Sequence, residues 1–329
     1  MEDKLAWFNE VERLIDVLGI INTRIDKEEG YKVEKERTFF DEMEQRGVYL
    51  TERQRKQIEK KMSGILSYEP RIGIFGKTGV GKSSLCNALF GQNICPISDI
   101  AACTRNPQEV ILNVGTKGIK LLDVPGVGES LERDKEYAAL YAKLLPELDL
   151  VLWLLKADDR AMASDETFFK NVVKPHIEQG KQFFFVINQV DKLEPFREWN
   201  EERHEPGPRQ YLNIQRKINS VAEQFSFPAS TVIPVSASEK YGLERLVEEI
   251  IFALPKEKTI TVFKAVSDDI KSETAEKQVK RNFIEVVGDV IQDVIINAGI
   301  LAMGVSEIIG KVTELFKAVS FIKPRWWLF

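Results

Sequence analysis

The 329-residue chain has few of the residues that build covalent or metal-based scaffolds. It contains three cysteines, Cys86, Cys95 and Cys103, and two histidines, His176 and His204. Three unevenly spaced cysteines cannot form a disulfide framework, and no nearby histidine completes a zinc set. The composition therefore predicts a protein of a reducing compartment, of which the cytosol is the simplest.

Long apolar runs and a basic excess are also missing. No run of 18 uncharged apolar residues occurs, so the sequence predicts no standard membrane-spanning helix. Residues 1–4 carry mixed charge and no apolar cleavable segment follows them, which predicts no signal peptide. The net charge of −5 excludes a global positive field and argues against nucleic acid as a partner. With 43% hydrophobic and 29% charged residues, the chain is typical of globular proteins.

What is present divides into three zones: an N-terminal helical region over 1–68, a central domain over 69–255 and a C-terminal helical region over 256–329. In the central zone, short apolar runs alternate with amphipathic stretches, which indicates parallel strands joined by helical crossovers. We predict strands near 71–75, 108–114, 119–123, 149–155, 183–188 and 231–235, and helices near 83–91, 134–146, 164–178, 209–226 and 242–253. The prediction is an α/β fold whose mostly parallel six-stranded sheet has helices on both faces. Only 108–123 reads as an antiparallel edge hairpin, because the turn Gly115-Thr116-Lys117-Gly118 is short.

A phosphate-binding loop follows the first predicted strand. The spacing G-x-x-x-x-G-K-S in strand–loop–helix context is specific for this loop, in which glycines let main-chain N–H groups surround a phosphate. We expect Lys82 to contact the β- and γ-phosphates as a catalytic residue and the Ser83 hydroxyl to bind Mg²⁺. The residues assigned to nucleotide binding here are Gly76, Lys77, Thr78, Gly79, Val80, Gly81, Lys82, Ser83 and Ser84.

A second motif, Asp123-Val124-Pro125-Gly126, ends the third predicted strand. An aspartate there can hold a magnesium-bound water, and the Gly126 N–H can reach a γ-phosphate, which would make this loop a nucleotide-dependent switch. We therefore assign Asp123 to the metal site and Gly126 to catalysis.

Two further segments are predicted to read the base. Asn188-Gln189-Val190-Asp191 ends the phenylalanine-rich strand, and the Asp191 carboxylate can accept hydrogen bonds from guanine N1–H and the exocyclic amine. Asn188 is expected to tie this loop to the phosphate loop. In Ser236-Ala237-Ser238, after the last strand, a main-chain N–H could meet the guanine oxygen.

Taken in order, these motifs resemble the Era-like branch, of TrmE-Era-EngA type, of the translation-factor-related P-loop GTPases. The resemblance covers about residues 70–254 and implies a G domain that binds GTP or GDP with Mg²⁺ and hydrolyses GTP. The stretch from Asp99 to Arg105 is similar to switch I of that branch. The resemblance implies that Thr104 is a second hydroxyl ligand of Mg²⁺ and takes part in catalysis. Arg105 is the arginine nearest to the reacting phosphate by sequence; it is most simply a solvated switch residue, with stabilisation of the phosphate charge as the alternative.

Three departures from the family pattern bear on activity. Gln189 stands where the family usually has a lysine whose stem stacks on the base, which predicts weaker affinity. Val127 cannot orient an attacking water, so intrinsic hydrolysis should be slow. Gly79 replaces the asparagine of potassium-stimulated relatives, which argues against potassium activation.

The flanks leave the biological role open. The apolar face of 283–321 and the N-terminal helices are expected to pack together, with peripheral membrane contact through the C-terminal region and its Trp326-Trp327 pair as the alternative. The leading function is a cytoplasmic GTP-hydrolysing switch activated by a partner or by self-association as a homodimer, through G domains or flanking helices. The second hypothesis is a dynamin-like, GTP-dependent assembly or membrane scaffold. An RNA- or ribosome-assembly role rests on family analogy alone.

Overall fold

The computed structural model describes part of the chain. The described residues are 39–68, 70–77, 79–91, 108–112, 119–123, 138–139, 141–159, 162–297, 307, 310, 311 and 314. Thr78, Thr104, Gly126 and the Trp326-Trp327 pair lie outside this set, as does most of the predicted first helix region. These assignments therefore stay predictions.

The chain divides into two compact units. One combines Met1–Tyr68 with Lys280–Phe329, and the other is Glu69–Val279. Residues 256–279, which the sequence analysis grouped with the C-terminal region, therefore belong to the unit that contains the sheet.

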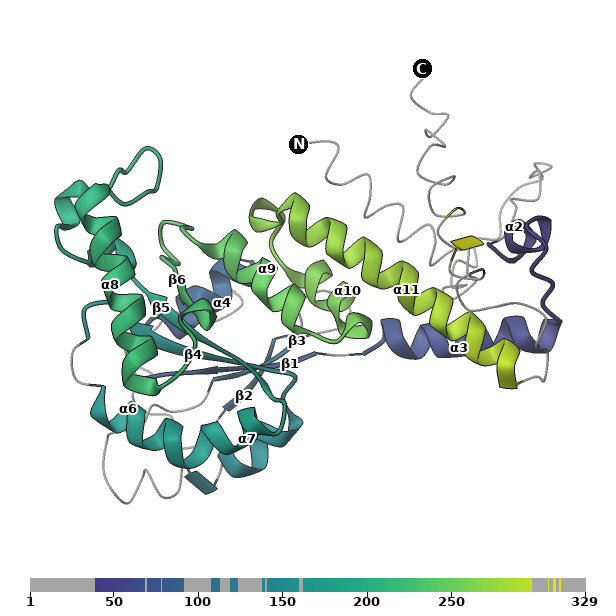
Figure 1. The fold of residues 1–329 in the computed structure, drawn as a ribbon, viewed down its shortest axis with the longest axis horizontal. Helices are drawn as coiled ribbons and strands as arrows, with labels where there is room; N and C mark the ends of the chain where they lie inside the picture. The colour runs from purple at the N-terminus through teal and green to yellow at the C-terminus, as the bar shows by residue number, and fades with distance from the viewer. Residues whose placement is uncertain are drawn as a thin grey trace, which may run out of the picture. The chain divides into compact units, whose positions relative to one another are not determined.

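The central unit is built on a six-stranded sheet in the order β2-β3-β1-β4-β5-β6 (Figure 1). β2 pairs antiparallel with β3, and every other neighbouring pair is parallel. The α/β prediction with a mainly parallel sheet is thus confirmed. The strands are β1 (Arg71–Phe75), β2 (Gln108–Leu112), β3 (Ile119–Asp123), β4 (Leu150–Lys156), β5 (Gln182–Asn188) and β6 (Val232–Pro234).

The central strands β4 and β5 are buried on both faces, as continuous apolar runs in a parallel sheet predict. Alternate residues enter one aromatic-rich core, where Phe169 packs against Phe185 with ring centroids 5.1 Å apart. Burying a side chain of this size stabilises the fold by roughly 2–3 kcal/mol. The sheet residues of this core are Phe75, Val151, Trp153, Leu155, Phe183, Phe185, Ile187 and Val232.

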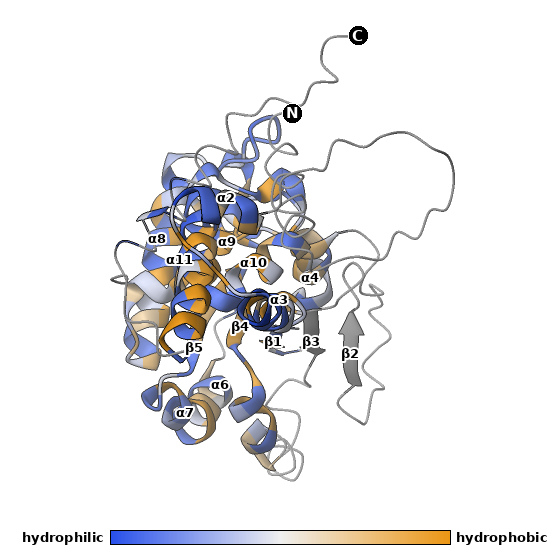
Figure 2. Ribbon diagram, turned by 90° about the vertical axis from the view of Figure 1, so that its right-hand side faces the viewer, coloured by the Kyte–Doolittle hydropathy of each residue, from blue (hydrophilic) through white to orange (hydrophobic). Residues whose placement is uncertain are grey.

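Helices cover both faces of the sheet because each carries an apolar and a polar side (Figures 1 and 2). One face packs against α6, a π-helical segment and α8, and α4 and α9 lie on the other. The helices are α4 (Lys82–Phe90), α6 (Ala163–Phe168), the π-helix Phe169–Val173, α7 (Lys174–Glu178), α8 (Pro208–Phe225), α9 (Leu243–Ala253) and α10 (Lys256–Ala265). Short 3-10 turns lie at Leu145–Glu147, Val190–Lys192, Phe196–Glu198, Ala229–Thr231 and Asp268–Ile270.

The flanking unit contains α2 (Phe39–Gln45), α3 (Glu52–Leu66) and the C-terminal part of α11 (Glu273–Asn297). Thr51 caps α3 in a capping box with Gln54, as its place before an acidic first turn predicts. Lys61 of α3 forms an ion pair with Asp293 of α11, so the two chain flanks contact each other here. Among the described residues, no helix combines the length and the hydrophobicity needed to cross a membrane.

Candidate nucleotide-binding site

The predicted motifs converge because parallel strands bring their carboxyl ends to one edge of the sheet. The loop 76–81 follows β1, Asp123 ends β3 beside Ile74 of β1, and Asn188 ends β5. Ser236 follows β6, which pairs with β5. Residues far apart in sequence therefore share this edge.

The phosphate loop requires glycine at two described positions. Gly76 has φ of +145°, and a Cβ there would lie 2.5 Å from the carbonyl oxygen of Leu154. Gly81 has φ of +90°, and its added Cβ would lie 2.4 Å from Asn188 Nδ2. At both positions a larger residue would have an unfavourable φ and its Cβ would clash with a neighbouring atom. Glycine at these two positions thus fixes the path of the loop main chain, as a phosphate cradle needs.

Lys82 is held over this loop. Its ammonium group donates to the main-chain carbonyls of Gly76 at 2.9 Å and Lys77 at 3.3 Å. Lys82 begins α4, so its charge lies at the positive end of that helix dipole. Ser83 and Ser84 follow in the first turn and are half-buried. A cation and a helix N-terminus at one loop form an environment that favours an anion.

Asn188 connects three loops, including the link to the phosphate loop that the sequence predicted. Its buried amide nitrogen donates to the carbonyl of Val80 at 2.9 Å. Its oxygen accepts a hydrogen bond from the Ala237 N–H at 3.1 Å. Both polar atoms of the side chain are thereby paired, which a buried amide requires.

Gln189 adds a second connection. Its φ of +64° places a non-glycine residue in the left-handed region, an arrangement that carries strain and is concentrated at functional sites. The side-chain nitrogen donates to the Gly79 carbonyl at 3.3 Å, and Lys192 donates to the side-chain oxygen at 3.1 Å. The residue predicted only to stack weakly on a base is thus part of the loop scaffold.

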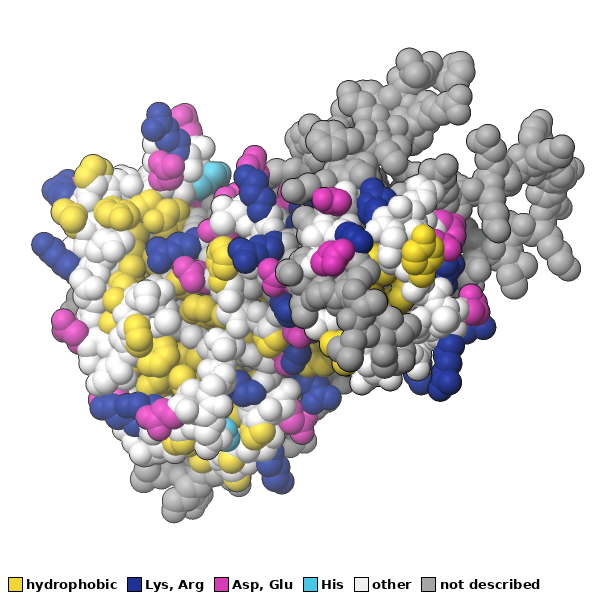
Figure 3. Space-filling model, turned by 45° about the vertical axis from the view of Figure 1, so that its right-hand side comes forward, with side chains coloured by type: hydrophobic (Ala, Val, Ile, Leu, Met, Phe, Trp, Pro, Cys, Tyr) yellow, Lys and Arg dark blue, Asp and Glu magenta, His cyan; other side chains and the backbone are white. Residues whose placement is uncertain are grey.

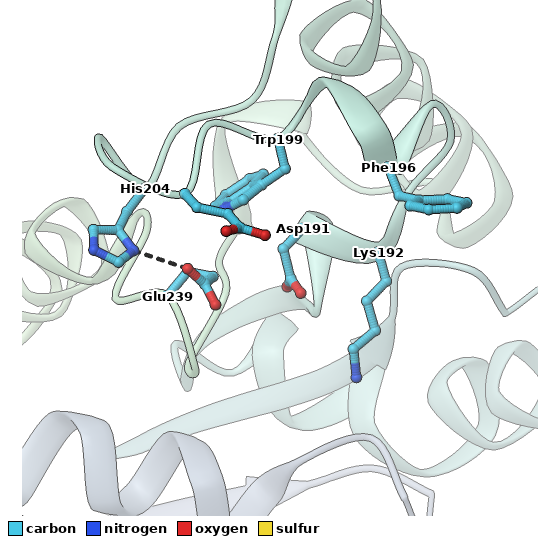
Figure 4. Close-up of a pocket in the computed structure, with 7 residues that line it drawn as sticks. Asp191, Lys192, Phe196, Trp199, His204 and Glu239 are labelled. Carbon is cyan, nitrogen blue, oxygen red and sulfur yellow. Dashed lines mark hydrogen bonds and ion pairs between the residues drawn. The ribbon is translucent and has the colours of Figure 1, made fainter.

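Asp191 has unused hydrogen-bonding capacity at this edge of the sheet. Its Oδ1 atom is buried and accepts no hydrogen bond from the described residues. Figure 4 shows its carboxylate beside a cavity of about 600 Å³. The cavity is lined by Asp191, Lys192, Phe196, Trp199, Glu201, His204 and Glu239. A carboxylate that lines a cavity and has spare acceptor capacity is suited to a ligand that brings N–H donors.

The loop after β6 forms another wall of this cavity. Ser236 is fully buried and exchanges two main-chain hydrogen bonds with Tyr241, while its hydroxyl lies 3.1 Å from that of Ser238. The N–H groups of Ala237 and Glu239 are used by Asn188 and by the Ser236 hydroxyl. Glu239 of this loop also contacts His204, whose Nδ1 lies 2.8 Å from Glu239 Oε2, as the dashed line in Figure 4 marks.

The residues suit Mg²⁺ in chemical type. Ser83 offers a hydroxyl in the first turn of α4, and Asp123 ends β3 next to β1. Oxygen donors of this kind, with phosphate oxygens and water, form the usual Mg²⁺ environment.

Sequence reasoning missed a buried ion pair beneath the phosphate loop. Lys77 Nζ lies 2.6 Å from Asp165 Oδ2 and 3.6 Å from Asp159 Oδ2, and Asp165 is 1% exposed. Burial raises the pKa of Asp165, although the hydrogen bond and charge of Lys77 oppose that rise. No motif spacing marks Asp165, because its partner comes from a distant segment. No motif spacing marks Gln210 either, because this helical residue bonds to the main chain of Asp191, which lies in a separate segment.

The surface seen in Figure 3 has acidic and basic side chains interspersed. This distribution agrees with the small net negative charge of the chain.

The chain is similar to known GTP-binding proteins and to two uncharacterized bacterial proteins. The sequence profile described as "50S ribosome-binding GTPase" matches residues 71–189. Uncharacterized protein YkfA of Escherichia coli (strain K12) is 44% identical over 75% of this chain and 82% of its own length, and YfjP of the same strain is 43% identical over 73% and 81%. The crystal structure of Aquifex aeolicus Era bound to GDP and AlF₄⁻ is 27% identical over 56% of each chain, with a TM-score of 0.43.

Proposed function

Because the chain belongs to the P-loop GTPase family that contains the 50S ribosome-binding GTPase domain and includes YkfA and YfjP, we propose that it binds GTP and GDP at the site described above and acts as a slow GTP-hydrolysing switch. The observation that carries this proposal is the pairing of two features on one sheet edge. One is a cationic glycine loop, and the other is the Asp191 carboxylate, which lines a cavity and has one buried oxygen without a hydrogen-bond donor among the described residues.

The phosphates bind along the loop from Gly76 to Ser84. Main-chain N–H groups of the loop and the start of α4 surround the β-phosphate, and Lys82 moves its ammonium from the loop carbonyls to the phosphate oxygens. Mg²⁺, when bound, neutralises charge that develops on the phosphates during transfer. Ser83 and Thr104 would hold the ion by their hydroxyl groups, and Asp123 would hold a water bound to it.

The base occupies the cavity beside Asp191. The Asp191 carboxylate accepts hydrogen bonds from guanine N1–H and from its exocyclic amine, a pair of donors that adenine does not offer. Ser238 supplies its main-chain N–H to the guanine oxygen, since the neighbouring N–H groups of Ala237 and Glu239 already have acceptors. Base and phosphate binding are coupled through Asn188.

Hydrolysis is slow in the isolated chain because the apolar side chain of Val127 cannot orient the water that attacks the γ-phosphate. A partner or a second copy of the chain completes the switch loops around Thr104 and Gly126. Membrane contact through the C-terminal region is a separate sequence-based proposal that this mechanism does not need.

Calorimetry with GDP and ADP at physiological Mg²⁺ tests the binding step. We expect GDP to bind at least about 100-fold more tightly than ADP, because a mismatched base leaves the Asp191 carboxylate unpaired. Equal affinities would refute guanine recognition.

Phosphate release assays test the hydrolysis step. Lys82→Ala should abolish GTP turnover, whereas Lys170→Ala, at an exposed lysine paired with Glu166, should leave it unchanged. Normal turnover by Lys82→Ala would refute the proposed mechanism.

A further inference from the structure

Gln210 is a fully buried polar residue behind the base loop. It is the third residue of α8, and its side-chain amide nitrogen donates to two main-chain carbonyls, those of Asp191 and Leu193, each at 2.9 Å. One side chain therefore holds the main chain at two points, Asp191 within the 3-10 turn Val190–Lys192 and Leu193 directly after it.

The side-chain carbonyl oxygen of Gln210 indicates why glutamine occupies this position. Its Oε1 atom is buried and accepts no hydrogen bond from the described residues. A buried unpaired oxygen is unfavourable, and an apolar side chain of equal volume would pack without it. The two donated hydrogen bonds are the feature that an apolar residue could not replace.

A second contact, through Glu198, holds the C-terminal end of the segment that begins at Asp191. Glu198 Oε2 accepts the N–H groups of Arg209 at 3.0 Å and Gln210 at 3.4 Å, and so caps the start of α8. The Arg209 guanidinium also donates to Glu198, and this hydrogen bond lowers the pKa of the Glu198 carboxyl. The chain from Asp191 to Glu198 is thus held at both ends to the start of α8. It carries Lys192 and Phe196, which Figure 4 shows at the cavity.

We propose that Gln210 is a positioning residue for guanine recognition, acting through the main chain of Asp191. The inference rests on the proposed function, in which the Asp191 carboxylate reads the base. Two hydrogen bonds to one base edge require the carboxylate to be placed within about 0.5 Å, so the residue that fixes its main chain governs discrimination.

The test compares GDP with inosine diphosphate, which lacks the exocyclic amine. The ratio of the two dissociation constants therefore reports the Asp191 geometry, whereas general loss of structure weakens both nucleotides equally. Gln210→Met keeps the volume and removes both donors. Gln224→Met is the matched control, since Gln224 lies on the same helix and bonds to Glu166 instead.

We expect Gln210→Met to lower the preference for GDP over inosine diphosphate by about threefold to tenfold, with Gln224→Met unchanged. Glu198→Ala should shift the ratio in the same direction without altering the core, and it serves if Gln210→Met fails to fold. In an Asp191→Ala background, Gln210→Met should cause no further change in the ratio.

An unchanged ratio in folded Gln210→Met, or an equal loss for both nucleotides, would overturn this inference alone. A wild-type chain that binds GDP no better than ADP would instead overturn the proposed function, and the inference with it. The two failures are therefore distinguishable.

Discussion

The Asn188 side chain donates a hydrogen bond to the Val80 carbonyl at 2.9 Å, although the two residues are 108 positions apart in sequence. The oxygen of the same amide accepts the Ala237 N–H. One buried residue therefore holds the phosphate loop, the base loop and the last loop in register. This arrangement makes the site a unit in which a change in one loop reaches the others.

Replacing that amide should uncouple the loops. In Asn188→Ala, the buried Val80 carbonyl loses its partner at a cost of about 1–3 kcal/mol, and the half-buried Ala237 N–H loses its acceptor at a smaller cost. We expect GDP affinity, measured by calorimetry, to fall by at least about tenfold. Asn219→Ala, at an exposed position on α8, is the control. Equal GDP affinity in the two variants would show that the coupling has no energetic role.

Substitution of Gly81 should be more harmful than its positive φ alone predicts, because an added side chain would clash with Asn188. Gly81 and Gly180 have φ values of +90° and +93°, so alanine costs about 1–2 kcal/mol at either position. Only at Gly81 does the added Cβ meet another group, Asn188 Nδ2 at 2.4 Å, whereas nothing lies within 4 Å at Gly180.

Urea unfolding should therefore show a larger loss of stability for Gly81→Ala than for Gly180→Ala, and GDP binding should be lost only in the former. Matching stabilities would mean that the Asn188 amide moves aside freely.

Asp191→Asn should change the preferred base. Xanthine carries a carbonyl oxygen where guanine has the exocyclic amine, and the asparagine amide can donate to that oxygen. We expect competition binding to show weakened GDP and improved xanthosine diphosphate binding, by about tenfold or more in each direction. Asp191→Ala should weaken GDP without improving xanthosine diphosphate. If both variants behave alike, the carboxylate does not face the base edge.

Asp165 should make the stability of the protein depend on pH. Burial raises its pKa above the ordinary value of 3.8, so the folded chain binds this proton more tightly than the unfolded chain. Its contribution to the free energy of unfolding must then decrease as pH rises from about 3.8 through the folded pKa.

Urea unfolding of wild type and Asp165→Asn across this range measures that contribution. The advantage of wild type over the variant should shrink as pH rises, with Asp158→Asn as an exposed control for loss of charge. An advantage that grows with pH would contradict the assignment.

The sequence predicted the parts of the site whose chemistry is local. A loop that wraps a phosphate needs glycine, lysine and serine at fixed spacing after a strand, so Gly76 to Ser83 could be located without a structure. The alternation of apolar strands and amphipathic helices predicted the α/β class, because burial on both faces leaves that pattern. The position of Asn188 at a strand end also predicted its link to the phosphate loop, whereas base recognition by Asp191 stays a prediction.

The remaining features depend on contacts between distant segments, which no spacing records. Gln189 was expected only to stack less well than lysine, but folding brings its amide to the Gly79 carbonyl. The pairing of Lys77 with Asp165, and the support of Asp191 by Gln210, arise only when helices α6 and α8 pack against the sheet. Sequence by itself determined which chemical groups the site contains. The buried partners of those groups were decided by the tertiary structure. Burial makes an unpaired polar group costly, and the packing of distant segments selects the group that pairs with it.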